Sequence, residues 1–149
     1  MIQSMLAPGI MISACGLLLL GMNSKYSLVV TRIRALDEEK RKLKLHADEN
    51  KITKDQEKRL NSISVQIGKF AYRIRMVRNA VIYYSIAVAF FILTCLTIGF
   101  HFIIKNIDLT GIVLLLFLIG MLSVFAGIMF ACREVIKGYQ IVQIEIQES

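Results

Sequence analysis

Long apolar runs and one charged segment make up this chain. The apolar runs cover residues 2–22, 80–102 and 110–132. None of them contains Asp, Glu, Lys or Arg. At about 1.5 Å per residue, a helix over each run would cross the roughly 30 Å apolar core of a bilayer. The pattern predicts one all-α membrane domain over residues 1–149, with three transmembrane helices in contact with the lipid bilayer.

The first run contains the letters ISAC, ending at Cys15, which resemble the site where bacterial lipoproteins are cleaved and lipidated. A cleaved signal has positive charge before its apolar region, and that region ends at the cleavage site. Here no charged side chain precedes Cys15, and the apolar run continues to Met22. We therefore interpret residues 2–22 as a retained membrane span.

Between the first two runs, apolar residues recur at alternating steps of three and four, as in the seam of a coiled coil. The first series is Val29, Ile33, Leu36, Leu43 and Ala47, with Lys40 as a polar interruption, and the second is Leu60, Ile63, Ile67, Phe70, Ile74, Val77 and Val81. Thr53 and Gln56 have the spacing of a helix capping box. We predict an antiparallel helical hairpin, a stalk over residues 24–78 that turns near 48–52. Its two helices should continue the first and second spans without a break.

The third run carries its own series of small residues, which are Gly120, Ser123, Gly127 and Ala131. Small residues let membrane helices approach closely, so this series predicts tight packing within the protomer or against a neighbour. The tail over residues 133–149 fits a strand or a helix, and we expect a helical continuation of the third span that frays after Ile146.

Charge predicts the orientation. Residues 23–79 contain 15 of the 18 Lys and Arg residues but only 7 of the 11 Asp and Glu residues. Basic segments beside membrane spans stay in the cytoplasm. We therefore expect a multi-pass protein of the bacterial cytoplasmic (inner) membrane, with its N-terminus outside and its C-terminus in the cytoplasm. Since topology accounts for the net charge of +7, nucleic acid is not an expected partner.

Several basic residues fall at the expected inner boundary of the membrane: Lys25, Arg32, Arg73, Arg75 and Arg78. Cationic side chains at this depth attract anionic lipid headgroups. We predict that these five residues contact such headgroups.

Three stretches of the chain resemble a known family. They are "LAPGIMISACGLLLLGMNSKYSLVVTRIRAL" at the first span, "RIRMVRNA" before the second span and "CREV" after the third. In this order they are similar to the bacterial membrane proteins of domain-of-unknown-function family 2721, over nearly the whole chain. The resemblance implies a three-span membrane protein with a cytoplasmic helical segment. It implies no reaction and no catalytic residues.

The residue types that usually carry catalysis or hold metals are scattered. His46 and His101 would lie on opposite sides of the bilayer, and the three cysteines form no CxxC pair. A metal site needs clustered ligands, so Cys15, Cys95 and Cys132 fit better as small packing residues. We expect no enzyme activity, no cofactor and no metal site.

One face of the first helix is small or polar along its length. Steps of three and four residues join Gly9, Ser13, Gly16, Leu20, Asn23, Ser27, Thr31 and Arg34, which we call the polar stripe. Such a face suits close packing between membrane helices. It equally suits the wall of a pore, with Leu20 as an apolar constriction and Asn23 and Ser27 in contact with water. In both cases the partner of this face would be another copy of the chain.

The expected function follows from that face. We predict a homo-oligomer that forms a small ion channel or pore lined by the first span. The alternative is a non-conducting structural or sensory membrane protein whose helical stalk binds a partner.

Topology can be tested with a membrane-impermeant thiol reagent applied from outside. A cysteine placed at Asn106 should react and one at Asn50 should not, because the charge distribution puts these positions on opposite sides. The unmodified chain, with its own three cysteines, sets the background. The reverse labelling pattern would overturn the predicted orientation.

Overall fold

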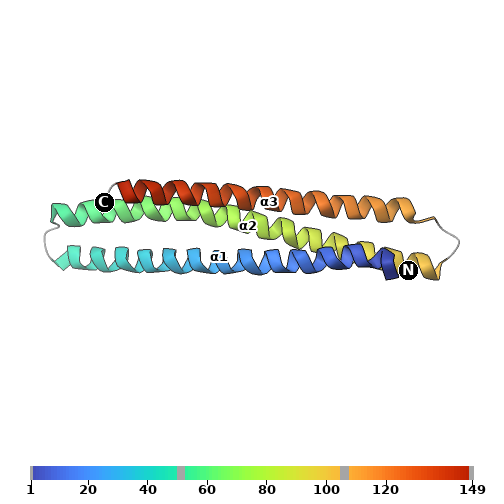
Figure 1. Ribbon diagram of the computed structural model, residues 1–149. Helices are drawn as coiled ribbons and strands as arrows, with labels where there is room; N and C mark the ends of the chain where they lie inside the picture. Colours follow the sequence, from blue (N-terminus) through green and yellow to red (C-terminus); the bar gives the residue numbers. More distant parts are fainter. Residues whose placement is uncertain (1, 50–52, 105–107, 148–149) are drawn as a thin grey trace.

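A computed structural model describes residues 2–49, 53–104 and 108–147 of the chain. Over these residues the protein forms three helices, α1 (Ile2–Glu49), α2 (Lys54–Ile103) and α3 (Thr110–Gln147). They lie alongside one another in an elongated bundle, and α2 packs against both α1 and α3 while those two meet at few positions (Figure 1). Each of the three is long and apolar enough to cross a membrane, which indicates a helical membrane protein.

Each helix continues from its apolar run into a more polar segment, as the sequence predicted. α1 extends over 48 residues, about 72 Å, and the single proline at its seventh position does not end it. At the start of α2, the backbone N–H of Thr53 donates a hydrogen bond to Oε1 of Gln56 at 3.4 Å, as expected of a capping box. α3 continues as a helix to Gln147, so the expected helical tail is confirmed.

The charged segments of α1 and α2 lie antiparallel beside each other (Figure 1). Nη2 of Arg59 on α2 lies 2.9 Å from Oε1 of Glu39 on α1. Of the predicted turn at 48–52, residues 48 and 49 belong to α1 instead. Residues 50–52 and 105–107, including Asn50 and Asn106, lie outside the described residues. The coiled-coil geometry of this pair and its cytoplasmic placement stay predictions.

The two apolar series of the sequence face inward. Ile63 and Val77 on α2 are fully buried, and Val29 on α1 is 7% exposed. The other members of both series whose side chains are described, including Ile67 and Phe70, are half-buried. Steps of three and four therefore identified the contact face of both helices, and the most buried positions lie where the stalk joins the spans and near its middle.

Between the apolar halves of the helices, the core depends on a close approach of α3 to α2. Tyr84 and Phe91 of α2 are 1% and 0% exposed. Their rings lie against glycines of α3: a Cβ added to Gly127 would come within 2.7 Å of Tyr84 Cε1, and one added to Gly120 within 2.8 Å of Phe91 Cε1. The small-residue series of α3 thus packs within the protomer.

The same contact is held by polar and aromatic groups. The hydroxyl of Ser123 donates a hydrogen bond to the backbone carbonyl of Tyr83 at 2.8 Å. The rings of Tyr83 and Phe130 stack with centroids 5.3 Å apart. A hydroxyl that satisfies a carbonyl of the neighbouring helix fixes the register of the two helices in an apolar environment.

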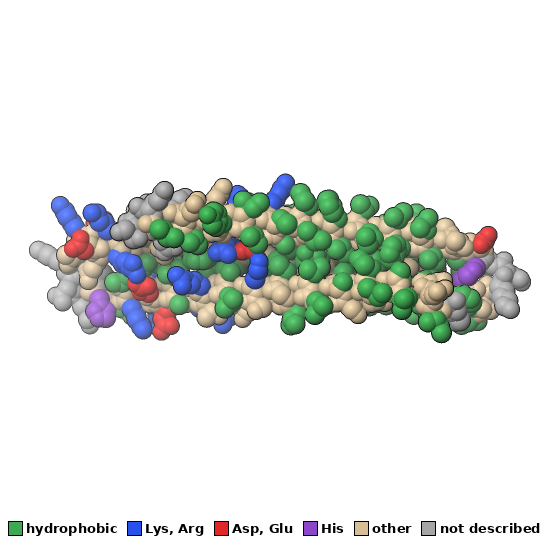
Figure 2. All heavy atoms as spheres, in the orientation of Figure 1, with side chains coloured by type: hydrophobic (Ala, Val, Ile, Leu, Met, Phe, Trp, Pro, Cys, Tyr) green, Lys and Arg blue, Asp and Glu red, His purple; other side chains and the backbone are tan. Residues whose placement is uncertain are grey.

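Surface composition separates the bundle into two parts. Apolar side chains cover the part that contains the N-terminus of α1, and basic and acidic side chains gather on the part that contains the start of α2 (Figure 2). Exposed Leu, Ile and Phe side chains along all three helices fit a lipid environment for the first part. The charged part fits water.

Replacing Gly127 by alanine should destabilise the bundle, because the new methyl group would meet the buried Tyr84 ring. We expect a loss of about 1–3 kcal/mol, seen as a lower unfolding temperature in detergent by circular dichroism. Gly111→Ala is the matched control, since nothing lies within 4 Å of its added Cβ and alanine favours the helix. Equal unfolding temperatures for the two variants would contradict the packing of α3 on Tyr84.

Candidate functional site

The polar stripe of α1 lies on the surface of the protomer. Seven of its residues are exposed and Gly9 is half-buried. Nothing lies within 4 Å of a Cβ added to Gly9 or Gly16, whereas Gly120 and Gly127 of α3 are filled by rings. The chain therefore uses the small residues of α3 for its own packing, whereas no described residue of another helix fills the space beside Gly9 and Gly16 of α1.

Helical periodicity divides α1 into three faces. Cys15, Met22 and Val29, spaced seven residues apart, are buried against the rest of the bundle. At about 100° per residue, the polar stripe lies roughly 140° to one side of this buried face. The other side carries exposed apolar residues, which are Leu6, Ile10, Leu17 and Leu28. The exposed surface of α1 thus has an apolar side suited to lipid and a small, polar side that is not.

The polar side chains of the stripe differ in whether they have a hydrogen-bond partner within α1. The hydroxyl of Thr31 donates to the carbonyl of Ser27 at 2.9 Å, and that of Ser13 donates to the carbonyl of Gly9 at 3.4 Å. The Asn23 amide has no hydrogen-bond partner among the described residues. Asn23 follows directly on the apolar run, so it is the stripe residue with the greatest need for a partner from outside the protomer.

A second polar feature is buried where the three helices meet. Glu134 of α3 is 2% exposed, and its Oε1 accepts hydrogen bonds from Nη2 and Nε of Arg73 on α2, at 2.7 and 3.2 Å. Its Oε2 lies 3.5 Å from Nζ of Lys25 on α1. One carboxylate therefore links all three helices. This contact also joins α1 to α3, which touch at few other positions.

Local sequence explains how this charge group is accommodated. Gly138, one turn after Glu134, leaves room for the guanidinium, since a Cβ there would lie 3.1 Å from Nη2 of Arg73. A buried carboxylate is costly unless charged donors surround it. Arg73 supplies two donors to one oxygen, and Lys25 approaches the other. The arrangement can hold the helices in register, and no reaction follows from its geometry.

The role of Glu134 was not predicted from the sequence, which gave it only as part of the "CREV" stretch. A signal existed: Glu134 is the only carboxylate between residues 109 and 144, and it lies two residues beyond the third apolar run. An ionisable residue at the end of a span commonly faces other helices and has a partner there.

The five basic residues at the membrane boundary separate into two groups. Lys25 and Arg73 contact Glu134. Arg32, Arg75 and Arg78 are exposed. The contact of these residues with lipid headgroups stays a prediction, and the exposed three are free to make it at the surface of the bundle.

Histidine and cysteine residues are placed far apart. His46 lies in the last turn of α1 and His101 in the last turn of α2, at opposite ends of the bundle. Cys15 is buried, Cys95 half-buried and Cys132 exposed, and all three are free thiols. Within the described ranges, no three His, Cys, Asp or Glu side chains come together as a metal-binding group.

Comparison with known proteins gives one match. A sequence profile described as "Protein of unknown function (DUF2721)" matches residues 5–144. No curated protein and no solved structure matches the chain.

Glu134→Gln should weaken the bundle, because it leaves the Arg73 guanidinium, 22% exposed, without its counter-charge. We expect a loss of about 3 kcal/mol, measured as a lower unfolding temperature in detergent. The matched control is Glu39→Gln. Its partner Arg59 makes the same pair of contacts through Nε and Nη2, at 3.2 and 2.9 Å, but both side chains are at least 42% exposed.

The control should cost less than about 1 kcal/mol, as surface ion pairs do. Arg73→Met combined with Glu134→Gln should recover part of the stability lost by Glu134→Gln, since it removes the unpaired cation. Similar losses for Glu134→Gln and Glu39→Gln would show that burial adds nothing to this contact.

Proposed function

The chain belongs to the DUF2721 family of proteins of unknown function, and we propose from the geometry of α1 that it forms a homo-oligomeric ion pore. In this assembly the polar stripe of each copy lines a common axis. The observation that carries the proposal is that the polar stripe is exposed and that the space beside its glycines is open. The space beside Gly120 and Gly127 of α3 is instead filled by aromatic rings.

The direction of the polar stripe supports assembly through α1. Lys25 lies on the opposite side of α1 from the polar stripe and contacts Glu134 of α3. The polar stripe therefore lies on the side of α1 away from α3. In this arrangement α2 and α3 form the outer layer of the oligomer, and their exposed Leu, Ile and Phe side chains contact lipid. A ring of α1 helices then forms the inner layer, and the exposed apolar side of each α1 packs against the neighbouring copy.

Residue types along the polar stripe support conduction with a narrow point. Gly9, Ser13 and Gly16 leave space for water between neighbouring helices. Leu20, 69% exposed in the protomer, is the one large apolar residue among them. A ring of leucines closes a narrow pore by expelling water from it. Arg34 lies further along the same face, where a ring of positive charge would favour anions.

The alternative is that the polar stripe serves only to pack copies against one another in a non-conducting protein. The hydrogen bonds of Ser13 and Thr31 within α1 favour it, because hydroxyls satisfied on their own helix do not need water. Both alternatives need the oligomer, and only the pore needs an open axis. A measurement of ion conduction therefore distinguishes the pore from the packing interpretation.

Leu20→Ser should raise ion leak through oligomers reconstituted into vesicles, because a hydroxyl lets water remain at the constriction. Leu18→Ser is the matched control: it makes the same chemical change two residues away, about 200° around the helix. We expect the control to change leak little. Size-exclusion chromatography of both variants checks that the oligomer is kept.

Arg34→Glu tests the sign of the selectivity. Reversing the charge at the inner mouth should shift the ratio of anion to cation permeability towards cations, measured as a change in reversal potential under a salt gradient. Intact oligomers that pass no ions, with Leu20→Ser equally silent, would contradict the pore and favour the packing interpretation.

A further inference from the structure

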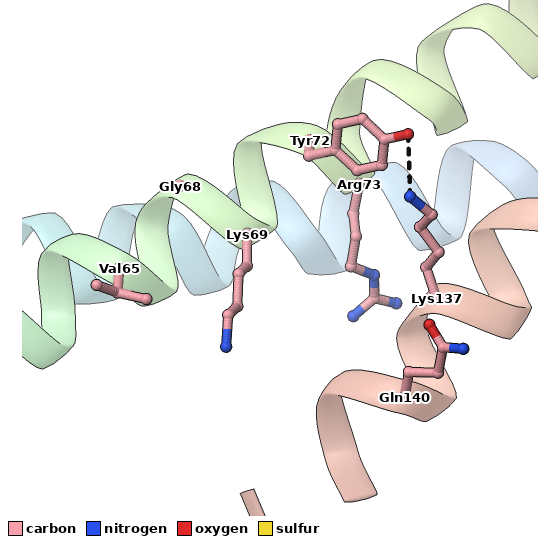
Figure 3. A pocket seen from close by; sticks show the side chains of 7 residues that line it. All are labelled: Val65, Gly68, Lys69, Tyr72, Arg73, Lys137 and Gln140. Atoms are coloured by element: carbon pink, nitrogen blue, oxygen red, sulfur yellow. Dashed lines mark hydrogen bonds between the residues drawn. The ribbon is translucent and has the colours of Figure 1, made fainter. Parts of the chain in front are cut away.

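A recess between α2 and α3 gathers basic side chains, and none of the described residues that line it is acidic. It has a volume of about 510 Å³, and its charged and polar lining comes from Lys69, Tyr72 and Arg73 of α2 and from Lys137 and Gln140 of α3. Lys69 and Arg73 project from α2 towards α3, and Lys137 and Gln140 line the recess from α3 (Figure 3). We call it the basic recess.

The donors of the basic recess are only partly used. Nζ of Lys137 donates to the hydroxyl of Tyr72 at 3.3 Å and lies 4.5 Å from the centre of that ring. Arg73 uses Nε and Nη2 for Glu134, and its Nη1 has no partner among the described residues. The same holds for the Nζ of Lys69. Glu134 balances Arg73, and no other described acidic side chain lines the recess to balance the two lysines, which fits an anion.

The depth of the basic recess fits the phosphate layer of a membrane. Lys137 lies five residues beyond the third apolar run, about 8 Å along the helix. Arg73 and Lys69 lie seven and eleven residues before the second run, about 10 and about 16 Å. The headgroup layer is roughly 5–8 Å thick on each side of the apolar core. A long basic side chain spans several ångströms, so Lys137 and Arg73 reach the headgroup layer, and Lys69 approaches it from the water side.

An apolar surface leads from the basic recess towards the apolar core of the membrane. Tyr83 lies three helical turns after Tyr72, and Phe130 lies two turns before Lys137. Both are on the faces that line the recess, and their rings stack with centroids 5.3 Å apart. Ile86, three residues beyond Tyr83 on α2, is 41% exposed. This surface can receive the acyl chains of a molecule whose charged group sits in the recess.

We infer that the basic recess binds the phosphate of an anionic membrane phospholipid. Lys69, Lys137 and Nη1 of Arg73 donate to the phosphate oxygens, Gln140 contacts the rest of the headgroup, and the acyl chains lie along Tyr83 and Phe130. Because the donors come from two helices, the lipid joins α2 to α3 next to the Glu134 contact. The site does not depend on the polar stripe or on conduction.

A comparable recess in the stalk provides the control. It is lined by Lys40, Lys44, Lys54 and Lys58, but Glu57 lines it as well. Lys44 lies 22 residues beyond the first apolar run and Lys58 lies 22 residues before the second, about 33 Å along each helix. The stalk recess is thus basic but lies too far from the apolar core to hold a bilayer lipid.

The test measures lipid binding to the full chain in a zwitterionic detergent, by native mass spectrometry and by the shift in unfolding temperature. The probes are phosphatidylglycerol, phosphatidylcholine and inorganic phosphate. The site variant is Lys69→Gln with Lys137→Gln, and the control variant is Lys44→Gln with Lys58→Gln. All four lysines are exposed or near the surface, so both variants are expected to fold, which their lipid-free unfolding temperatures check.

Phosphatidylglycerol should bind and raise the unfolding temperature of the wild-type protein and of the control variant. The site variant should bind it at least about tenfold more weakly, as loss of two charged hydrogen bonds predicts. Three outcomes would overturn the inference: equal binding of phosphatidylcholine, equal stabilisation by inorganic phosphate, or equal losses in the site and control variants.

Discussion

Helices in a bilayer gain little from hiding apolar surface from one another, because lipid is as apolar as they are. The contact that holds this bundle is therefore one of shape: α3 offers Gly120 and Gly127, and α2 inserts the rings of Phe91 and Tyr84 against them. The Ser123 hydroxyl on the Tyr83 carbonyl fixes the register of that contact. With the register fixed, Glu134 comes level with Arg73, and Lys137 with Tyr72. Both polar features near the membrane boundary thus depend on the packing of the apolar core.

The small residues of α3 and those of α1 have different surroundings in the bundle. In α3 the space they leave is filled by aromatic rings from the same chain, so these residues are part of the protomer. In α1 the corresponding space at Gly9 and Gly16 is open, and the adjoining side of the helix exposes Leu6, Ile10 and Leu17. An exposed polar face therefore lies beside an exposed apolar face on the same helix. The apolar face suits lipid, and the small, polar face suits other copies of the chain or water.

Basic residues near the membrane boundary also have distinct physical roles, although all of them are positively charged. Arg73 and Lys25 neutralise a buried carboxylate and tie α1, α2 and α3 together. Arg32, Arg75 and Arg78 are exposed. Water and salt screen each of these charges, so one alone attracts lipid headgroups weakly but several together attract them effectively. Lys69 and Lys137 face one recess from two helices. Position on the helix, rather than the residue type, separates these roles.

The sequence by itself determined the long-range order of the protein. Run length and the absence of charge located three helices able to cross a membrane, steps of three and four identified the contact faces around Val29, Ile63 and Val77, and the small residues of α3 indicated close packing. These features are local, since they depend on the period of a helix and on the solvent around it. Tertiary structure decided the rest: which basic residue meets Glu134, which glycines are filled, and which lysines share a recess. Those outcomes depend on how α2 and α3 are rotated and shifted along their axes relative to each other. The fit of two rings onto two glycines sets this arrangement, and the periodicity of a single helix does not predict it.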